Sequence, residues 1–432
     1  MKFILNACSN FYPYAVGGTE VYVDNYCRYL ENLGQQPVVI CAVPDEAFSD
    51  HETVFEDDFL KVCKYYHNIT IVYGLALKST STDSIYSKKG APSSLSYLKF
   101  LKSQKILKQL STLHIHSFTS TIGIDLFLQV ISENPSMIVI TSYHTPISCP
   151  KGTLMYKDTL QECRYKPSVK TCSDCILSSQ KKIVLPLSKL INFLNLSHQK
   201  IPAIFKVKHL VKLELQSFEY LKSITQEWWC YSNGIKDILK INGIGNNSIK
   251  MARHGISEIF LKQTDIKKAK DKTIYMFSGR MVKIKGVITL LKAWLQLPVN
   301  VDKQLWLTAY PESDNPEIST LLKRISKRED IHFFGPKTQN ELVKLYAMAH
   351  FVIIPSEWYE IGPLVLHEAI SKHANVICSD IGGCKELANY YGSSAIVFKA
   401  GNFHQLAQKI KSSKYKKTDT LPKTFSRHFD IL

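Results

Sequence analysis

Several features that would assign the chain to a class at once are missing from its 432 residues. No apolar run approaches the ~20 residues that a membrane-spanning helix needs. The opening MKFILNACSNFYP is apolar for too few residues to be a signal peptide, so we expect it to form a first buried strand. Most of the eleven cysteines stand singly, which fits a reducing compartment. These absences predict a cytoplasmic protein.

Common catalytic motifs are missing as well. The chain has no phosphate-binding P-loop, no HExxH motif and no Gly-x-Ser-x-Gly elbow. The acidic FEDDF stretch, with Asp57 and Asp58, follows no clear strand, so it predicts no Mg²⁺ site. Acidic residues are also scarce, since 37 Asp and Glu face 54 Lys and Arg for a net charge of +17. That excess implies an anionic partner: nucleic acid, an acidic membrane or a phosphate-bearing substrate.

What the sequence does contain is a regular alternation of strands and helices, clearest after residue 272. Amphipathic segments such as GVITLLKAWLQL and QNELVKLYAMA separate short apolar runs, which is typical of a parallel sheet covered on both faces. The predicted strands are Thr273–Ser278, Gln304–Ala309, Ile331–Phe334, Phe351–Ile354, Asn375–Cys378 and Ala395–Phe398.

The first half repeats this pattern less cleanly. Strands are predicted at KFILNA, PVVICAV, TLHIH and SMIVITSY, and helices at GTEVYVDNYCRYLENLG, SYLKFLKSQKILKQL and IGIDLFLQVISE. We therefore predict an α/β protein of two Rossmann-like, doubly wound domains, residues 1–215 and 216–432, with their join near 210–225.

Ligands of open parallel sheets bind at the carboxyl ends of the strands, and several polar or glycine residues follow a predicted strand. If the two domains oppose these edges, the residues face one crevice. They are Gly17, Gly18, His116, His144, Arg280, Lys285, Glu360, Gly382 and Gly383.

Each of these residues also has a simpler interpretation. Arg280 and Lys285 precede a helix beginning near Val287, where two cations suit a diphosphate, but they could be a solvated basic loop. Gly17-Gly18 allows close approach of an anion or sugar or forms a plain turn. His144 could orient a substrate hydroxyl or be structural, and the signal at His116 is weaker still.

The segment SEWYEIGPLVLHEA, residues 356–369, is the most informative one. Its carboxylates Glu360 and Glu368 would be separated by about 12 Å on a continuous helix, too far to act side by side. Pro363 favours the first helical position, so we expect Glu360 on a loop and Glu368 in the early helix. One bound molecule could then meet both carboxylates; the alternative is a helix entrance with ordinary surface acids.

These motifs together resemble the retaining glycosyltransferases of family 4. The resemblance rests on the N-terminal Gly-Gly, GR-x4-KG from Gly279, E-x7-E from Glu360 and GG-x2-E from Gly382. It implies the two-domain GT-B fold and transfer of a sugar from a UDP-, GDP- or ADP-linked donor without a catalytic metal or other cofactor.

The resemblance also implies roles for individual residues. Arg280 and Lys285 would neutralise the donor diphosphate, Glu368 would hold the ribose hydroxyls, Glu360 would stabilise charge at the anomeric centre, and His144 would contact a sugar hydroxyl. The remaining donor-binding residues of this expectation are Gly17, Gly18, Ile361, Gly362, Pro363 and Leu364.

The chain departs from the family pattern in two places. LTAYPESD, Leu307–Asp314, stands where members often carry Gly-x-Gly, so we expect this region and its donor contacts to be rebuilt. The sequence also ends with FSRHFDIL, which leaves little chain for a helix returning to the first domain and predicts weaker interdomain closure.

One group of cysteines is not scattered. Cys149, Cys163, Cys172 and Cys175 fall in an insertion of about residues 145–180, directly after His144, which we expect to form a flap on the acceptor side. Four thiolates with one CxxC pair could hold a structural Zn²⁺. The alternatives are reduced structural cysteines or a redox CxxC, although no thioredoxin-like context surrounds it.

The positive charge has a candidate location too. Residues 181–222 hold eight lysines and two acids, a mixture with Leu, Ile and Phe that suits an anionic membrane surface or simply a solvated helix face. The lysine-rich tail 409–423 could add to it. Flotation with anionic liposomes tests this peripheral association, and no salt-sensitive binding would count against it.

The leading hypothesis is thus a glycosyltransferase that moves a hexose to a saccharide or lipid-linked acceptor in polysaccharide, lipopolysaccharide or glycolipid biosynthesis. A nucleotide-sugar epimerase of the same fold is one alternative, which donor-only incubation would reveal. A basic nucleic-acid-binding protein is another, but no recognition motif supports it, so we expect no nucleic-acid partner.

Overall fold

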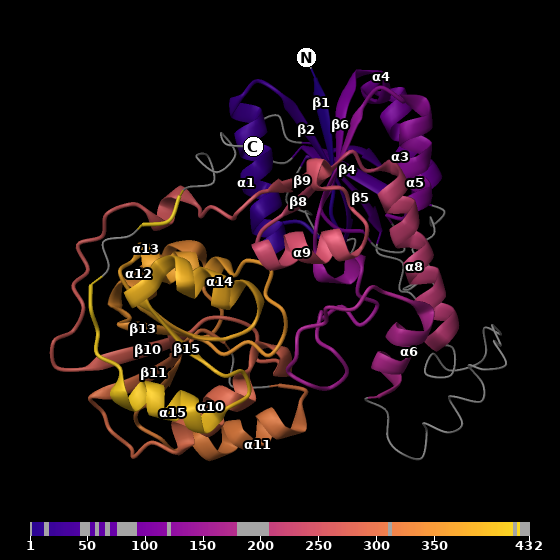
Figure 1. The fold of residues 1–432 in the computed structure, drawn as a ribbon. Helices are drawn as coiled ribbons and strands as arrows, with labels where there is room; N and C mark the ends of the chain where they lie inside the picture. The colour runs from indigo at the N-terminus through magenta and orange to yellow at the C-terminus, as the bar shows by residue number, and fades with distance from the viewer. Residues whose placement is uncertain are drawn as a thin grey trace. The chain divides into compact units, whose positions relative to one another are not determined.

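The computed structural model describes residues 2–12, 17–43, 52–56, 60–64, 70–75, 93–118, 122–178, 207–309, 313–417 and 421–423. The chain forms two compact units (Figure 1). The N-terminal unit comprises residues 1–158, 163–230 and 235–252, and the C-terminal unit comprises residues 159–162, 231–234 and 253–432. The two units are described separately below.

The N-terminal unit is built on a sheet in the order β3-β4-β5-β2-β1-β6-β7-β8-β9. The strands from β5 to β9 in this order run parallel, whereas β3 and β4 pair antiparallel at one edge. The strands are β1 Phe3–Ala7, β2 Gln36–Val43, β3 Thr53–Glu56, β4 Leu60–Lys64, β5 Thr70–Leu75, β6 Leu110–Ile115, β7 Ile138–Ser142, β8 Glu227–Cys230 and β9 Ile249–Met251.

The join between the units lies later than the predicted 210–225. β8 and β9 extend the parallel sheet beyond β7, so the N-terminal unit continues to residue 252, except for residues 231–234. The predicted helix from Ser96 is interrupted where Lys105 adopts a left-handed φ of 56°. The helices are α1 Gly18–Asn32, α3 Ser93–Ser103, α4 Ile106–Gln109, α5 Ile124–Glu133, α6 Val169–Leu177, α8 Val207–Ile224 and α9 Asn233–Ile241, with short 3-10 turns η1 Thr145–Ile147 and η3 Asn246–Ser248.

The C-terminal unit contains one parallel sheet in the order β12-β11-β10-β13-β14-β15. All six strands predicted after residue 272 are present. The chain moves outward one way from β10 and then crosses to β13 on its other side, so the carboxyl ends of β10 and β13 form the switch point where ligands bind in such sheets. The strands are β10 Thr273–Phe277, β11 Lys303–Leu307, β12 Ile331–Phe333, β13 Phe351–Ile354, β14 Asn375–Ser379 and β15 Ala395–Phe398.

Helices cover both faces of this sheet, α10, α11 and α15 on one face and α12, α13 and α14 on the other (Figure 1). They are α10 Val287–Leu295, α11 Pro316–Ile325, α12 Gln339–Met348, α13 Leu364–Ser371, α14 Gly382–Tyr391 and α15 Phe403–Ser412, with 3-10 turns η4 Glu258–Phe260, η5 Lys283–Lys285 and η6 Gly392–Ser394.

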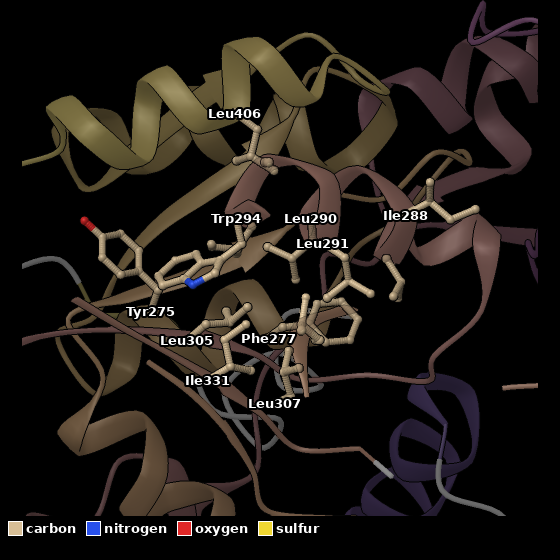
Figure 2. Close-up of a cluster of buried hydrophobic side chains, with 14 of the residues drawn as sticks. Tyr275, Phe277, Ile288, Leu290, Leu291, Trp294, Leu305, Leu307, Ile331 and Leu406 are labelled. Carbon is tan, nitrogen blue, oxygen red and sulfur yellow. The ribbon is translucent and has the colours of Figure 1, made fainter. Parts of the chain in front are cut away.

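The core between the sheet and α10 shows why the strand-end loops are held firmly. Trp294 and Leu290 of α10 pack on Tyr275 and Leu305 of the sheet, and Leu406 of α15 closes the cluster (Figure 2). Each such buried side chain stabilises the fold by about 1.5–3 kcal/mol, against about 0–1 kcal/mol for a surface ion pair. Apolar packing therefore fixes where β10 and α10 begin and end.

In the described parts of the chain, no helix combines the length and apolar character needed to span a bilayer.

Candidate functional site

The loop after β10 is pressed against the loop after β13 in the C-terminal unit. Gly286, at a φ of 70°, ends the turn η5 and begins α10. A Cβ added at Gly286 would stand 1.7 Å from the carbonyl oxygen of Pro355, so only glycine fits this approach. The amide of Glu357 also donates to the carbonyl of Ile284 over 2.9 Å. The backbones of the two strand-end loops are thus in direct contact. α10 begins at Val287, as predicted.

Lys285 and Glu360 meet at this junction. The Nζ of Lys285 donates to Oε1 of Glu360 over 2.7 Å, and the Oγ of Ser356 donates to the same oxygen over 2.7 Å. The ammonium lies 4.9 Å from the centre of the Trp358 ring. Burial alone would raise the pKa of Glu360, but the charge and hydrogen bonds of Lys285 and Ser356 outweigh it and hold the pKa below its ordinary value. Glu360 is therefore an ionised, buried carboxylate.

The Gly-Gly pair after β14 supports the same loop. The amide of Gly383 donates to the carbonyl of Glu360 over 2.6 Å. A Cβ on Gly382, whose φ is 55°, would stand 2.7 Å from that carbonyl oxygen. Side chains at these two positions would push the Glu360 loop away from the start of α14, so the glycines act through packing of the backbone.

Glu368 lies apart from this ion pair, on α13. Pro363 is the N-cap residue and α13 begins at Leu364, so the proline stands one position before the helical residue that we expected it to be. Tyr346 of α12 donates its hydroxyl to Oε2 of Glu368 over 3.2 Å. Burial raises the pKa of Glu368 to about 7, only partly offset by this hydrogen bond, although the residue keeps some exposure. The two glutamates therefore differ: Glu360 is ionised, whereas Glu368 titrates near neutral pH.

The other predicted donor residues line the same edge. Arg280 is exposed on the loop after β10. Ile361 and Leu364 are partly exposed, and Gly362 lies so near His254 that an added Cβ would stand 2.7 Å from the imidazole Cδ2. In LTAYPESD, residues 310–312 lie outside the described residues, but the hydroxyl of Ser313 donates to the carbonyl of Met281 over 2.9 Å. The loop after β11 is thus tied to the loop that carries Arg280.

The candidate residues of the N-terminal unit are largely uncharged. His144 follows β7, caps the turn η1 and packs edge-on against Phe118, with ring centres 6.2 Å apart. His114 of the adjoining strand β6 and His116, directly after that strand, stack with ring centres 3.8 Å apart. Burial, with a smaller contribution from His144, lowers the pKa of His116 to about 3. Burial lowers the pKa of His114 as well, so the stacked imidazoles of His114 and His116 are neutral at physiological pH.

Hydrogen bonds hold the stacked histidines in place. Nε2 of His116 lies 3.2 Å from Oδ1 of Asn6 on β1, and Nε2 of His114 lies 2.9 Å from Oγ of Ser142 on β7. The carboxyl ends of β1, β6 and β7 therefore share one polar cluster. Sequence reasoning did not identify Asn6, His114 or Ser142, and their positions at or near strand ends were the available signal.

The predicted Gly17-Gly18 turn begins α1, with Gly17 as its N-cap residue. Gly17 has a φ of −128°, which any residue can adopt. The carboxylate of Glu20, in the first turn of α1, lies 2.4 Å from the position of a Gly17 Cβ. An acidic side chain thus already occupies this helix start, and binding of an anion there stays a prediction.

Several other predictions meet no matching feature. Asp57 and Asp58 lie outside the described residues, as do residues 179–206 of the lysine-rich segment and parts of the tail. Within the described ranges, no three or more His, Cys, Asp or Glu side chains are grouped as they would be around a metal ion.

Sequence reasoning missed three residues of the C-terminal unit, Ser356, Trp358 and Tyr346. Ser356 contacts Glu360, Trp358 contacts Lys285 and Tyr346 contacts Glu368.

Comparison with known proteins first indicates a class. Residues 259–420 match the family model described as "Glycosyl transferases group 1", a range that contains Arg280, Lys285, Glu360 and Glu368. The pair of doubly wound units has the GT-B fold of glycosyltransferases, as predicted. No curated protein sequence matches the chain.

Particular solved structures share this fold at low sequence identity. Sucrose-phosphate synthase from Thermosynechococcus elongatus is 16% identical with a TM-score of 0.58, over 95% of this chain and 89% of that one. The Anabaena protein HepE in complex with UDP-glucose is 13% identical, with a TM-score of 0.59 over 95% and 89%. Starch synthase IV from Arabidopsis thaliana, bound to ADP and acarbose, is 13% identical, with a TM-score of 0.57 over 96% of both chains.

Proposed function

We propose that the protein is a retaining glycosyltransferase that takes a sugar from a nucleotide-diphosphate sugar. The observation that carries this proposal is the Lys285–Glu360 pair, 2.7 Å apart, at the carboxyl ends of the two central strands of the C-terminal unit. A site with a cation and an ionised carboxylate side by side matches the charges that separate when a sugar leaves a diphosphate.

The chemistry makes distinct demands at the two ends of the breaking bond. As the bond from the anomeric carbon to the diphosphate oxygen breaks, negative charge gathers on the diphosphate and positive charge on the sugar. Arg280 and Lys285, beside the start of α10, would stabilise the negative charge on the diphosphate. The buried carboxylate of Glu360 would stabilise the positive charge on the sugar. The two cations would supply this neutralisation without a catalytic metal.

Lys285 can serve both partners. An ammonium has three donors, and Lys285 keeps about a quarter of its side chain exposed, at 26%. It can therefore hold Glu360 and still reach a phosphate oxygen. Arg280, which is exposed, would add the charge-assisted bonds of its planar guanidinium.

Glu368 would anchor the nucleotide. Its carboxylate, partly exposed and oriented by Tyr346, can accept two hydrogen bonds from a ribose diol. A sugar hydroxyl favours an ionised acceptor, so binding would draw the pKa of Glu368 down from about 7. HepE in complex with UDP-glucose and starch synthase IV bound to ADP support a nucleotide as the ligand of this fold.

The N-terminal unit would bind the acceptor, a saccharide or a lipid-linked saccharide. His144, which is only partly buried beside the buried His116 and Asn6 pair, would contact a sugar hydroxyl there. The identity of the acceptor and the peripheral membrane association stay predictions. A lipopolysaccharide outer core galactosyltransferase is among the proteins of similar structure, and this likeness supports a glycan as the acceptor.

A thermal-shift screen tests the donor assignment. UDP-, GDP- and ADP-sugars are added to the wild type, to Glu368→Ala and to the control Glu317→Ala, whose carboxylate forms an exposed ion pair with Lys292. We expect one nucleotide class to stabilise the wild type and the control, and Glu368→Ala to lose most of the shift. The proposal fails if no nucleotide sugar stabilises the wild type. An equal response of Glu368→Ala would remove this carboxylate from the site, and turnover of the donor alone into another nucleotide sugar would favour an epimerase.

A further inference from the structure

Four of the eleven cysteines stand apart from the rest by their surroundings. The other seven are fully buried in the apolar interior of the two units. Cys149, Cys163 and Cys172 are only partly buried, and Cys175 is buried beside them. Cys149 follows the turn η1, Cys163 lies on an irregular segment, and Cys172 and Cys175 lie one turn apart on α6. We propose that these four cysteines form a structural zinc site, independent of the glycosyltransferase function.

The four thiols line the same cavity, which has a volume of about 40 Å³. This is room for a body the size of one or two water molecules, too little for a substrate and enough for a metal ion. The four sulfurs are close enough together that a charge on any one of them would raise the pKa of another. Residues from three parts of the segment 149–175 thus bring four soft ligands to one small cavity.

The backbone around the cavity is arranged to support a thiolate. The amide of Lys157 donates to the sulfur of Cys175 over 3.0 Å, the kind of outer contact that orients metal ligands and stabilises their charge. The loop that carries this amide has three left-handed residues in six, with φ values of 77° at Gly152, 51° at Leu154 and 51° at Lys157. Two of these are not glycine, and such strain persists only where the surroundings fix it.

The insertion has little apolar core of its own. Between residues 145 and 178 the regular structure is the turn η1 and α6, and α6 contributes Leu177 to a small cluster with Val207 and Val211 of α8. Small, loop-rich segments of this kind are commonly held by a metal or disulfides. All eleven cysteines are free thiols, so no disulfide cross-links this segment.

An all-sulfur ligand set selects the metal. Four thiolates suit Zn²⁺ in tetrahedral geometry with Zn–S distances of about 2.3 Å. Such a centre carries a net charge of −2, and the cation Lys151, which lines the same cavity, is placed to offset part of it. Binding releases the thiol protons and involves no change of oxidation state.

Side-chain rotation is needed to complete the site. As the side chains stand, no three potential ligands in the described part of the chain are grouped closely enough to hold a metal. A cysteine changes its sulfur position by rotation about one bond between staggered rotamers. The cavity provides the space into which the four sulfurs would turn.

Metal analysis of the full chain tests the proposal. The protein is purified in the presence of a thiol reductant and without chelator, and metals are quantified by plasma mass spectrometry. We expect about one zinc per chain, lost in Cys172→Ser/Cys175→Ser and retained in the control Cys41→Ala, whose thiol lies in the core of the N-terminal unit. Chelation of the wild type should lower its melting temperature and expose residues 145–178 to proteolysis, and added ZnCl₂ should reverse both.

The contrary outcomes are equally clear. A wild type that carries no zinc, and that neither gains zinc nor shifts its melting temperature when ZnCl₂ is added, overturns the site. So does a double variant that keeps its zinc, and iron with visible absorption would overturn the assignment to zinc. If the double variant does not fold, release of zinc from the wild type by a thiol-modifying mercurial replaces it. None of these results depends on donor binding, so failure here leaves the proposed function untouched.

Discussion

The two units use the same kind of sheet to present different chemistry at its carboxyl edge. In the C-terminal unit this edge carries full charges, with the ammonium of Lys285 held 2.7 Å from the carboxylate of Glu360. In the N-terminal unit the corresponding strand ends carry imidazoles, an amide and hydroxyls, with His114 stacked on His116. In both units the strand order brings polar side chains to the carboxyl edge of the sheet. The chemical type of these side chains then decides whether the edge suits an anion or a neutral hydroxyl.

The difference extends to protonation. Burial acts on both edges, but it raises the pKa of an acid and lowers that of a base. Glu368 of the C-terminal unit is raised from 4.5 to about 7, whereas His116 of the N-terminal unit is lowered from 6.5 to about 3. The stability of the two units therefore responds to pH in opposite directions, which gives a way to examine each unit within the intact chain.

The largest effect is expected from the buried ion pair. Lys285→Met removes the charge but keeps the stem, and it leaves Glu360 buried without its cation. We expect the free energy of unfolding to fall by about 3 kcal/mol and donor affinity to drop by about 10–100-fold, the worth of a charge-assisted hydrogen bond. Urea unfolding and calorimetric titration measure the two quantities.

A matched variant shows whether burial is the cause. Lys292→Met breaks the ion pair with Glu317, which is 2.6 Å long but exposed, and we expect a loss below about 1 kcal/mol with donor affinity unchanged. Equal losses in the two variants would mean that the charged edge of the C-terminal unit is an ordinary surface.

The second effect concerns Glu368. Its raised pKa means that its contribution to stability is fully present below about 4.5 and is lost as the pH rises through about 7. Glu368→Gln should remove this loss and raise stability at pH 8, relative to the wild type, by about 2 kcal/mol after allowance for partial exposure. Hydrogen exchange of α13 between pH 5 and 8, corrected for intrinsic rates, measures the change. A variant with the same pH profile as the wild type would contradict the shifted pKa.

The smallest effect concerns the N-terminal unit. Because the pKa of His116 is lowered, its contribution is fully present above pH 6.5 and is lost as the pH falls toward about 3. At a pH of about 5.5, one unit below the ordinary pKa of histidine, His116→Asn should reduce the acid loss of protection in β6 by about 1.4 kcal/mol. Glu368→Gln is its control, since it should leave the acid limb of β6 unchanged. If His116→Asn altered only the C-terminal unit, the two edges would not be independent.

Much of the fold could be predicted from the sequence, because alternating strands and helices leave a strong pattern of apolar residues. All six strands of the C-terminal sheet were predicted. The strands β3, β4 and β5 were not predicted; the edge strand β3 is short and mostly exposed, so it carries little apolar signal. The join between the units was predicted too early because β8 and β9 are short, at four and three residues, and their membership of the first sheet depends on pairing with β7.

The site was predictable to a smaller extent. Residues that follow a strand directly, such as Lys285 and Glu360, could be selected by that position alone. Their partners could not: Tyr346 lies on α12 and reaches Glu368 only through packing of two helices. His114 and Asn6 sit within strands at positions that are typical of core residues. Sequence position identifies the edge of a sheet, whereas contacts across it depend on the tertiary structure.

The backbone bonds between strand-end loops have a consequence for the energetics of recognition. The loop of Lys285 is joined to that of Glu357, and the loop of Glu360 is joined to Gly383, so the three loops behave as one body. A ligand that touches any one of them meets groups whose conformational entropy was lost during folding and need not be lost again on association. Affinity at such an edge comes from preorganisation, and substitutions at its glycines would act on the free protein before any ligand arrives.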